Sequence, residues 1–189
     1  MDLKFPIGIF QKPTLISETD IKNWIDTIAH FPGKIKTITA NLSVEKLNWK
    51  YRLEGWNIKQ VVHHCADSHM NSYIRFKLAL TEDNPTIKPY DEAKWAELTD
   101  ANDDDISASH SIIEGLHKRW ALLLQSFDED DFKRTFYHPE SNTKNRLDEI
   151  LGFYAWHCNH HLAHIEQALQ HNGMLNASPD SSENPFEEK

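Results

Sequence analysis

Four histidines lie within eight residues in the C-terminal part of the chain: His157, His160, His161 and His164. The surrounding segment has a helical pattern, and at about 100° per residue the four side chains share one arc of roughly 100°. Apolar residues lie on or beside this arc, so the imidazoles should face the core, where each needs a hydrogen-bond partner or a metal ion. Two pairs, His157 with His161 and His160 with His164, have the i, i+4 spacing that lets two imidazoles share one ion. Spacing alone does not choose between them.

A second cluster strengthens the prediction of a metal site. His63, His64 and His69 lie in another amphipathic segment, and the two stretches together contain seven of the twelve histidines. An i, i+4 pair plus one histidine from another helix makes a three-ligand site that leaves a position open for water or substrate. The alternative without a metal is a set of core histidines whose ring nitrogens are hydrogen-bonded to carbonyls and carboxylates. The two cysteines, Cys65 and Cys158, are expected to be buried apolar residues rather than ligands.

Length and charge limit the class of protein. A chain of 189 residues is long enough for one domain with a full core. Twenty basic against twenty-nine acidic residues give a net charge of −9, which opposes binding to nucleic acid or to a membrane. We find no signal peptide and no apolar run of about 18 residues, so we expect a cytoplasmic protein.

Amphipathic patterns predict four substantial helices and no strand. The helices cover, in chain order, about 17–42 with an interruption or kink at Pro32-Gly33, about 58–80, about 107–127, and about 145–173. Asn57 and Gln60 have the spacing of an N-cap and its reciprocal partner, and Ser17 or Thr19 can cap the first helix. This pattern predicts an all-α four-helix bundle with a polar site between facing helices.

The segments outside these helices have different characters. Residues 1–16 should form an extended arm over the domain, and residues 81–106 a long loop excursion with a short helical turn. An excursion of this length in a small domain is often functional. Residues 176–189 are polar and predicted to be a disordered tail, which leaves 1–175 as the domain.

The second predicted helix carries a polar line in which Asp67, Asn71 and Arg75 follow His64. One interpretation is the solvated face of an amphipathic helix. The other is a polar pocket in which His64 binds the metal and the remaining three contact the substrate or the ligands. The histidine-rich helix favours the second interpretation.

Several motifs together are specific for one family. The segment from Glu54 to Leu78, which contains His63-His64, is followed by Pro89-Tyr90, by Phe136-Tyr137-His138-Pro139 and by the run from Trp156 to His164. In this combination the chain resembles the YfiT branch of the DinB-like superfamily over nearly its whole length except the C-terminal tail.

The resemblance implies a four-helix bundle, a homodimer in many members, and one divalent metal ion, usually zinc or nickel, held by three histidines. Carried over by motif, the ligands are His64, His160 and His164. Members of the family are described as metal-dependent hydrolases. Related DinB-like proteins resemble transferases that conjugate a low-molecular-weight thiol, such as bacillithiol, to an electrophile.

We therefore predict a metal-dependent hydrolase of a small molecule, in which His64, His160 and His164 bind one zinc-type ion that activates water. The alternatives are a metal-dependent thiol transferase and a non-catalytic metal-binding bundle. Asp67, Asn71 and Arg75 are the pocket candidates, and the sequence indicates no catalytic base.

Overall fold

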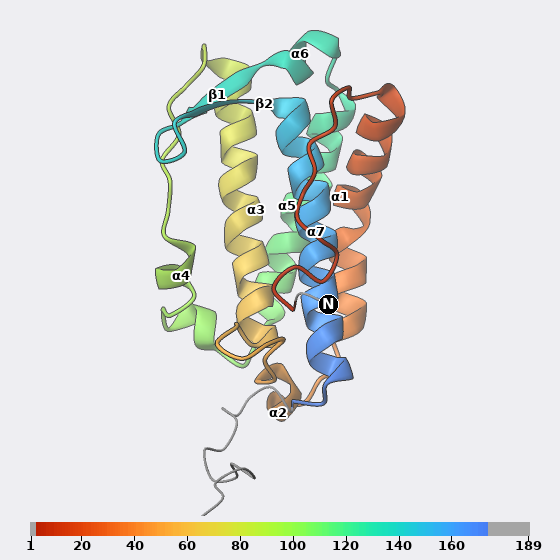
Figure 1. The fold of residues 1–189 in the computed structure, drawn as a ribbon, viewed down its shortest axis with the longest axis vertical. Coiled ribbons are helices and arrows are strands. Elements are labelled where there is room, and N and C mark those ends of the chain that lie inside the picture. The colour runs from red at the N-terminus through yellow and green to blue at the C-terminus, as the bar shows by residue number, and fades with distance from the viewer. Residues whose placement is uncertain (1–2, 174–189) are drawn as a thin grey trace, which may run out of the picture.

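The computed structural model describes residues 3–173, which fold mainly into helices (Figure 1). The predicted tail at 176–189, and with it the domain boundary at 175, lies outside the described residues. Four long helices are joined by short helices and one hairpin. In chain order the elements are α1 (Glu18–Thr39), α2 (Val44–Leu47), α3 (Ile58–Thr81), α4 (Glu92–Trp95), η1 (Asp100–Asn102), α5 (Ser107–Gln125), α6 (Glu129–Lys133), β1 (Thr135–His138), β2 (Thr143–Arg146) and α7 (Leu147–Gln170).

The long helices form a four-helix bundle. Both α1 and α3 pack against α5 and α7, so α1 and α3 occupy opposite corners. Helices α3 and α5 run in one direction, and α1 and α7 run in the other (Figure 1). Because α3 and α5 are parallel neighbours, the chain between them must return along the length of the bundle. Residues 82–106, here called the crossover, make that return on the outside, which explains the predicted long excursion.

Two capping boxes confirm the predicted starts of α1 and α3. The Ser17 side chain accepts from the backbone N–H of Asp20, and the Asn57 side chain accepts from that of Gln60. In each case the partner side chain binds back to the cap residue, which satisfies two N–H groups that the first helical turn leaves open. These local signals fix where the histidine-bearing helix α3 begins.

Of the two alternatives predicted at Pro32-Gly33, an interruption or a kink, the interruption is wrong, because α1 continues through Pro32. Ile28, Phe31 and Ile35 are fully buried, and burial of this face offsets the cost of proline inside the helix. Proline has no N–H, so the carbonyl of Ile28, four residues earlier, loses its helical donor. His117 of α5 donates to this oxygen from Nδ1 at 2.6 Å.

The hairpin of β1 and β2 was not predicted. The strands are antiparallel, with Thr135 opposite Arg146 and His138 opposite Thr143. The first residues of the crossover pair with β1, since Tyr137 N donates to Pro85 O at 2.9 Å and Ile87 N donates to Tyr137 O at 3.0 Å. The hairpin therefore anchors the crossover at one end of the bundle (Figure 1).

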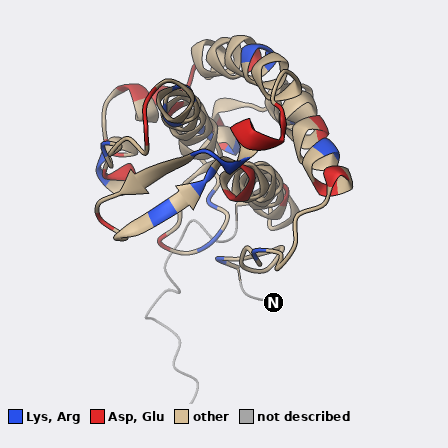
Figure 2. Ribbon diagram, turned by 90° about the horizontal axis from the view of Figure 1, so that it is seen from above, with Lys and Arg blue, Asp and Glu red and all other residues tan. Residues whose placement is uncertain are grey.

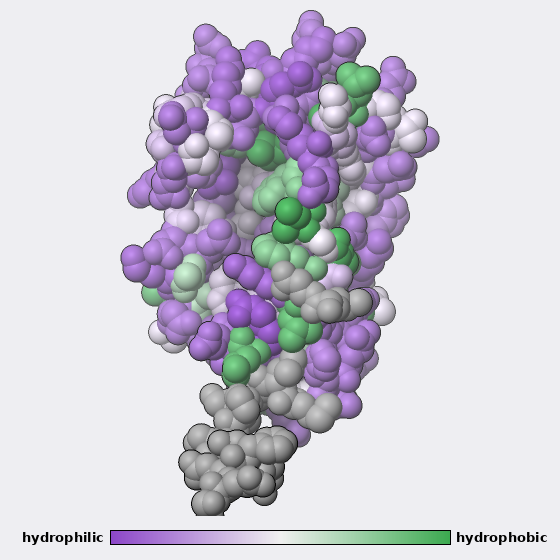
Figure 3. All heavy atoms as spheres, viewed as in Figure 1, coloured by the Kyte–Doolittle hydropathy of each residue, from purple (hydrophilic) through white to green (hydrophobic). Residues whose placement is uncertain are grey.

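The N-terminal arm lies over the domain, as predicted, and the structure places it along α7 (Figure 1). Trp156 Nε1 donates to Gly8 O at 3.1 Å, and Gln167 Nε2 donates to Leu3 O at 3.0 Å. Hydrophobic side chains gather along the middle of this face, which is otherwise largely hydrophilic (Figure 3). The arm thus covers part of the helix that carries four histidines.

Charge is spread around the molecule. Acidic and basic residues are distributed over the helices rather than gathered into one basic face (Figure 2). Within residues 3–173, none of the helices combines the length and apolar character needed to cross a bilayer.

The core lies between the four long helices and contains an unusual share of polar side chains. Its largest fully buried residues are Trp120, Phe31, Phe76 and Phe136, followed by isoleucines and leucines. Eight of the twelve histidines are buried with them. Buried imidazoles need partners, and these histidines find most of them in one another.

Candidate metal centre

Three buried imidazoles converge between α3 and α7. His157 Nε2 lies 3.4 Å from His64 Nε2 and 3.1 Å from His161 Nε2. One ring nitrogen from each of the three residues lies within 4.8 Å of the others. His157 and His161 stand on consecutive turns of α7, and α3 packs beside them. We call His64, His157 and His161 the triad.

The chemistry of the triad fits a divalent transition metal. Burial lowers the pKa of His64 to about 4, and it lowers those of His157 and His161 well below the usual value. The three rings are therefore neutral at pH 7, which is the form that binds metal. Bonds of about 2.0–2.1 Å to a tetrahedral ion place ligand nitrogens about 3.3 Å apart, close to the observed separations.

Hydrogen bonds among the three rings explain the arrangement less well than a bound metal ion does. A ring nitrogen has one lone pair, so His157 Nε2 cannot accept from His64 and His161 at once. A single cation would satisfy all three nitrogens together. Imidazole ligands suit zinc, nickel and similar ions rather than magnesium or calcium.

His160 and His164, which the resemblance predicts as ligands, lie elsewhere on α7. His160 stacks on Trp156 with ring centres 4.4 Å apart, and its buried Nδ1 has no partner within residues 3–173. His164 stacks on Tyr51, with ring centres 3.8 Å apart. In the described part of the chain, neither residue approaches His64 within hydrogen-bonding distance. The structure thus gathers His64 with His157 and His161, one of the two pairs that spacing left open.

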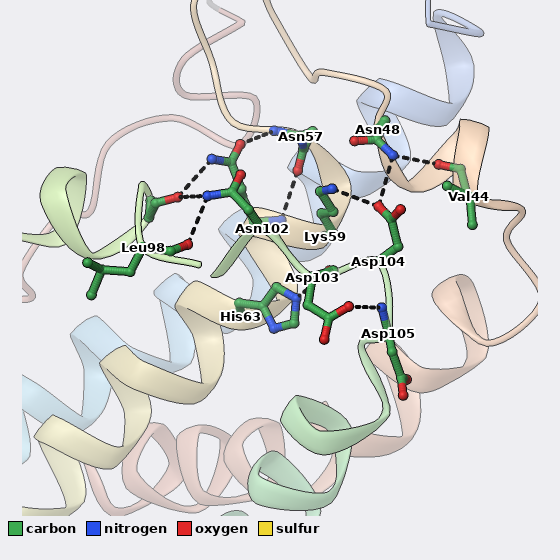
Figure 4. Close-up of polar contacts among 12 residues, drawn as sticks. Val44, Asn48, Asn57, Lys59, His63, Leu98, Asn102, Asp103, Asp104 and Asp105 are labelled. Carbon is green, nitrogen blue, oxygen red and sulfur yellow. Dashed lines mark hydrogen bonds and ion pairs between the residues drawn. The ribbon is translucent and has the colours of Figure 1, made fainter. Parts of the chain in front are cut away.

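His63 belongs to a separate polar cluster at the start of α3 (Figure 4). Its Nε2 donates to Asp103 O at 3.0 Å, and its Nδ1 accepts from Ser109 Oγ at 2.7 Å. Beside it, Lys59 Nζ lies 2.7 Å from the Asp104 carboxylate. These contacts tie α3 to the end of the crossover and use both nitrogens of His63. His63 is therefore structural, whereas its neighbour His64 belongs to the triad.

A cavity of about 570 Å³ opens beside the triad at His157. Its walls come from α3, the crossover, the hairpin and α7, so the segments that are not long helices supply much of the lining. Five residues of the lining have side chains that can bind charge or transfer a proton: Arg75, Tyr90, Glu92, His138 and Tyr154. Burial raises the pKa of both Tyr90 and Tyr154, so each remains an O–H donor at neutral pH.

Of the three pocket candidates on α3, only Arg75 lines this cavity. Its guanidinium has no hydrogen-bond or ion-pair partner among residues 3–173. Asn71 Nδ2 instead donates to the backbone carbonyl of Asp67 at 2.9 Å. Partial burial and the charge of Asp100 raise the pKa of the Asp67 carboxyl. The polar line is therefore divided, with Arg75 in the pocket and the other two outside its lining.

Glu92 is the functional candidate that the sequence did not reveal. It is the first residue of α4, it lines the cavity, and its Oε2 lies 4.0 Å from His64 Nε2. Partial burial raises the pKa of this carboxyl, while Arg75 opposes the shift. The available signal was its position two residues after the Pro89-Tyr90 motif, inside the excursion already expected to be functional.

The cysteines are placed as predicted. Cys65 and Cys158 are free and fully buried. Burial raises the pKa of both thiols, which disfavours the thiolate form that binds metal. They act as small apolar core residues.

Comparisons with known proteins identify the family of this chain. The model of the DinB superfamily matches residues 32–165. The chain is 51% identical over 165 residues to the "Putative metal-dependent hydrolase" of Oceanobacillus iheyensis, which covers 87% of this chain and 95% of that protein. It is 43% identical over 173 residues to the "Putative metal-dependent hydrolase YfiT" of Bacillus subtilis, covering 92% of this chain and 97% of that one.

A solved structure also matches. YfiT from Bacillus subtilis, described as a probable metal-dependent hydrolase with an unusual four-helix bundle topology, superposes with a TM-score of 0.88 at 43% sequence identity. The match covers 92% of this chain and 99% of that one.

Proposed function

The chain belongs to the DinB superfamily, and on that premise we propose that it is a metal-dependent hydrolase whose His64, His157 and His161 hold one divalent ion. Zinc is the proposed metal, with nickel as the alternative. The observation that carries the proposal is the convergence of three neutral imidazoles beside a cavity. This ligand set differs from the set that the resemblance implies, in which His160 and His164 replace His157 and His161.

A divalent ion held by three imidazoles lowers the pKa of a bound water toward about 7, which supplies a nucleophile for hydrolysis. Glu92 is proposed as the general base, because its Oε2 lies beside His64 and faces the cavity. Arg75 is proposed to bind a negative charge on a small-molecule substrate through its guanidinium, which has no hydrogen-bond or ion-pair partner among residues 3–173. Tyr154, whose hydroxyl donates to Ser68 O at 3.3 Å, lines the same cavity as these two groups.

Transfer of a low-molecular-weight thiol is the second candidate function. The same ligands would favour its thiolate, and Arg75 would bind a carboxylate of the thiol. Assays of ester or amide hydrolysis and of thiol conjugation, run side by side on the zinc-loaded protein, separate the two. Turnover in neither assay, with metal bound, would favour a non-catalytic bundle.

The proposal extends to a homodimer, from the resemblance, and to a cytoplasmic location, from the sequence pattern. Sedimentation of the full chain tests the assembly, and a monomer at micromolar concentration would remove the dimer from the proposal. Fractionation of cells that express the full chain tests the location, and recovery outside the cytoplasm would contradict it.

The ligand set is tested by paired alanine variants on α7. We expect His157→Ala and His161→Ala to lose nearly all metal after zinc loading and gel filtration, because each removes one of three ligands. His160→Ala, with the same helix and the same change, should keep one zinc per chain. Elemental analysis measures the ratio.

The opposite result is equally informative. Zinc retained by His157→Ala but lost by His160→Ala would restore the set His64, His160 and His164. A wild-type protein that binds neither zinc nor nickel would contradict the proposed function itself.

A further inference from the structure

We propose that two chains of histidines, each ending at a backbone carbonyl, orient His157 and His161 and leave Nε2 of both rings unprotonated toward the metal. His69, His117 and His164 are the positioning residues. The inference rests on the proposed function only in treating His157 and His161 as ligands. The order of the hydrogen bonds follows from the described residues alone.

The first histidine chain is a series of hydrogen bonds from His157 to His69 of α3, then to His117 of α5, and finally to a carbonyl of α1. A carbonyl only accepts, so His117 must carry its proton on Nδ1, which lies 2.6 Å from Ile28 O. His117 Nε2 is then an acceptor, and His69 donates to it from Nδ1 at 2.7 Å. His69 Nε2 in turn accepts from His157 Nδ1 at 3.0 Å. His157 therefore presents an unprotonated Nε2 to the triad.

The second chain runs from His161 to the N-terminal arm. Lys4 O accepts from His164 Nε2 at 3.1 Å, so the remaining nitrogen of His164 is an acceptor. This atom, Nδ1, lies 3.4 Å from His161 Nδ1, which must donate. His161 therefore also presents an unprotonated Nε2. His164 becomes a residue that holds a ligand in place rather than a ligand.

Burial supports this order of protons. His69 and His117 are fully buried, and their hydrogen-bond partners within residues 3–173 are imidazoles and a carbonyl rather than carboxylates. Such surroundings favour the neutral ring with one proton, so assigning one nitrogen assigns the other. Neither chain can be reversed, because reversal would require a carbonyl oxygen to donate.

Both histidine chains end where the fold brings a main-chain carbonyl within hydrogen-bonding distance of an imidazole. Pro32 removes the helical donor of Ile28 O, and the arm brings Lys4 O onto α7. Histidine ligands commonly donate their second nitrogen to such a partner, which fixes the ring and its tautomer. Here one or two further imidazoles stand between the ligand and the carbonyl.

The order of protons is tested by NMR of the full-length, metal-free protein with ¹⁵N-labelled histidine. Two-bond ¹H–¹⁵N correlations identify which ring nitrogen carries the proton. We expect the proton on Nδ1 of His69 and His117 and on Nε2 of His164. A proton on Nε2 of His69 or His117, or on Nδ1 of His164, would overturn the proposal.

The effect on the metal is tested by competition with a chelator. His117→Phe removes the acceptor for His69, and we expect zinc affinity to fall by about 10- to 100-fold while one zinc still binds. His117→Gln keeps an acceptor and a donor and should retain most of the affinity. The same pattern is expected at His164: His164→Phe should lower the zinc affinity, and His164→Gln should retain most of it.

His63→Gln is the control, because His63 is also a buried histidine but lies outside both histidine chains. Its zinc affinity should equal that of the wild type. Equal losses in His117→Phe and His117→Gln, or no loss in either, would contradict a positioning role. If His117→Phe does not fold, the glutamine variant and the NMR assignment still decide the question.

The outcomes separate this inference from the proposed function. The stated tautomers in a protein that binds no metal would support the hydrogen-bond order and refute the metal centre. Zinc bound through His157 and His161 in a protein with the opposite tautomers would support the metal centre and refute the hydrogen-bond order.

Discussion

Arg75 and Glu92 place opposite charges on the wall of the cavity, and we expect them to separate substrate binding from turnover. Glu92→Gln should lower kcat by roughly 10²- to 10⁴-fold at unchanged metal content, because the amide cannot accept a proton. Arg75→Met should raise KM for anionic substrates and leave kcat largely unchanged, because it removes a charge that binds substrate and transition state alike. Steady-state kinetics with parallel metal analysis measure both effects.

Glu97→Gln is the matched control for Glu92, since Glu97 is an exposed carboxylate on the same crossover and lies outside the cavity lining. Its kinetics should equal those of the wild type. Loss of zinc from Glu92→Gln would indicate that Glu92 binds the ion rather than accepting a proton. Unchanged KM in Arg75→Met would show that the guanidinium does not contact substrate.

The sequence predicted a metal site on the histidine-rich helix, yet it could not choose the ligands from geometry. His157 and His161 are offset from His160 and His164 by only about 60° around α7. Which pair faces α3 depends on how α7 is rotated in the bundle. Contacts with α1, α3 and the arm set that rotation, and none of these is encoded in the spacing of the histidines. Glu92 was missed for a related reason, because only the folded crossover brings it beside His64.

At the scale of the helix, Pro32 links backbone chemistry to the metal site. Pro32→Ala restores an N–H at that position, which can donate to Ile28 O within α1. We expect the free energy of unfolding to rise by up to ~3 kcal/mol, the cost of proline inside a helix. Zinc affinity should fall, because Ile28 O is then shared between two donors.

Denaturant unfolding and chelator competition measure the two quantities of this prediction separately. If the free energy of unfolding rises while zinc affinity falls, the loss of affinity comes from the hydrogen-bond chain and not from a general loosening of the fold. Zinc affinity that rises together with stability would contradict it.

Among the elements, the sequence predicted those that have local signals. Ser17 and Asn57 mark helix starts through capping boxes that need only neighbouring residues. The hairpin was missed because each strand has only four residues and is held partly by pairing with the crossover. The sequence left open whether α1 continues through Pro32, because distant packing and a donor from α5 compensate for the missing N–H. In each case the stabilising partner lies far away along the chain.

At the scale of the whole molecule, the buried histidines should make the metal-free protein sensitive to acid. The unfolded chain takes up protons on histidine below about pH 6.5, whereas burial lowers the folded pKa of His117 to about 4. Between these values the unfolded state binds more protons, so the free energy of unfolding falls as pH falls. The slope is about 1.4 kcal/mol per pH unit for each such histidine.

Urea midpoints of the metal-free protein at pH 7 and pH 5 check this expectation, and the lower midpoint should occur at pH 5. His117→Gln should show a smaller difference, since it removes one of the contributing groups. Equal midpoints at both pH values would mean that the histidines titrate alike in the folded and unfolded states.

Both histidine chains end on main-chain oxygens, those of Ile28 and Lys4, and this has a consequence for how the protein tolerates genetic change. A codon substitution at either position replaces the side chain and leaves the terminal acceptor intact. The histidine tautomers thus depend on where the backbone places these two carbonyls and not on which side chains stand at positions 4 and 28. Mutations that redirect the backbone, through the arm or through Pro32, reach the metal centre even though they alter no group that touches it.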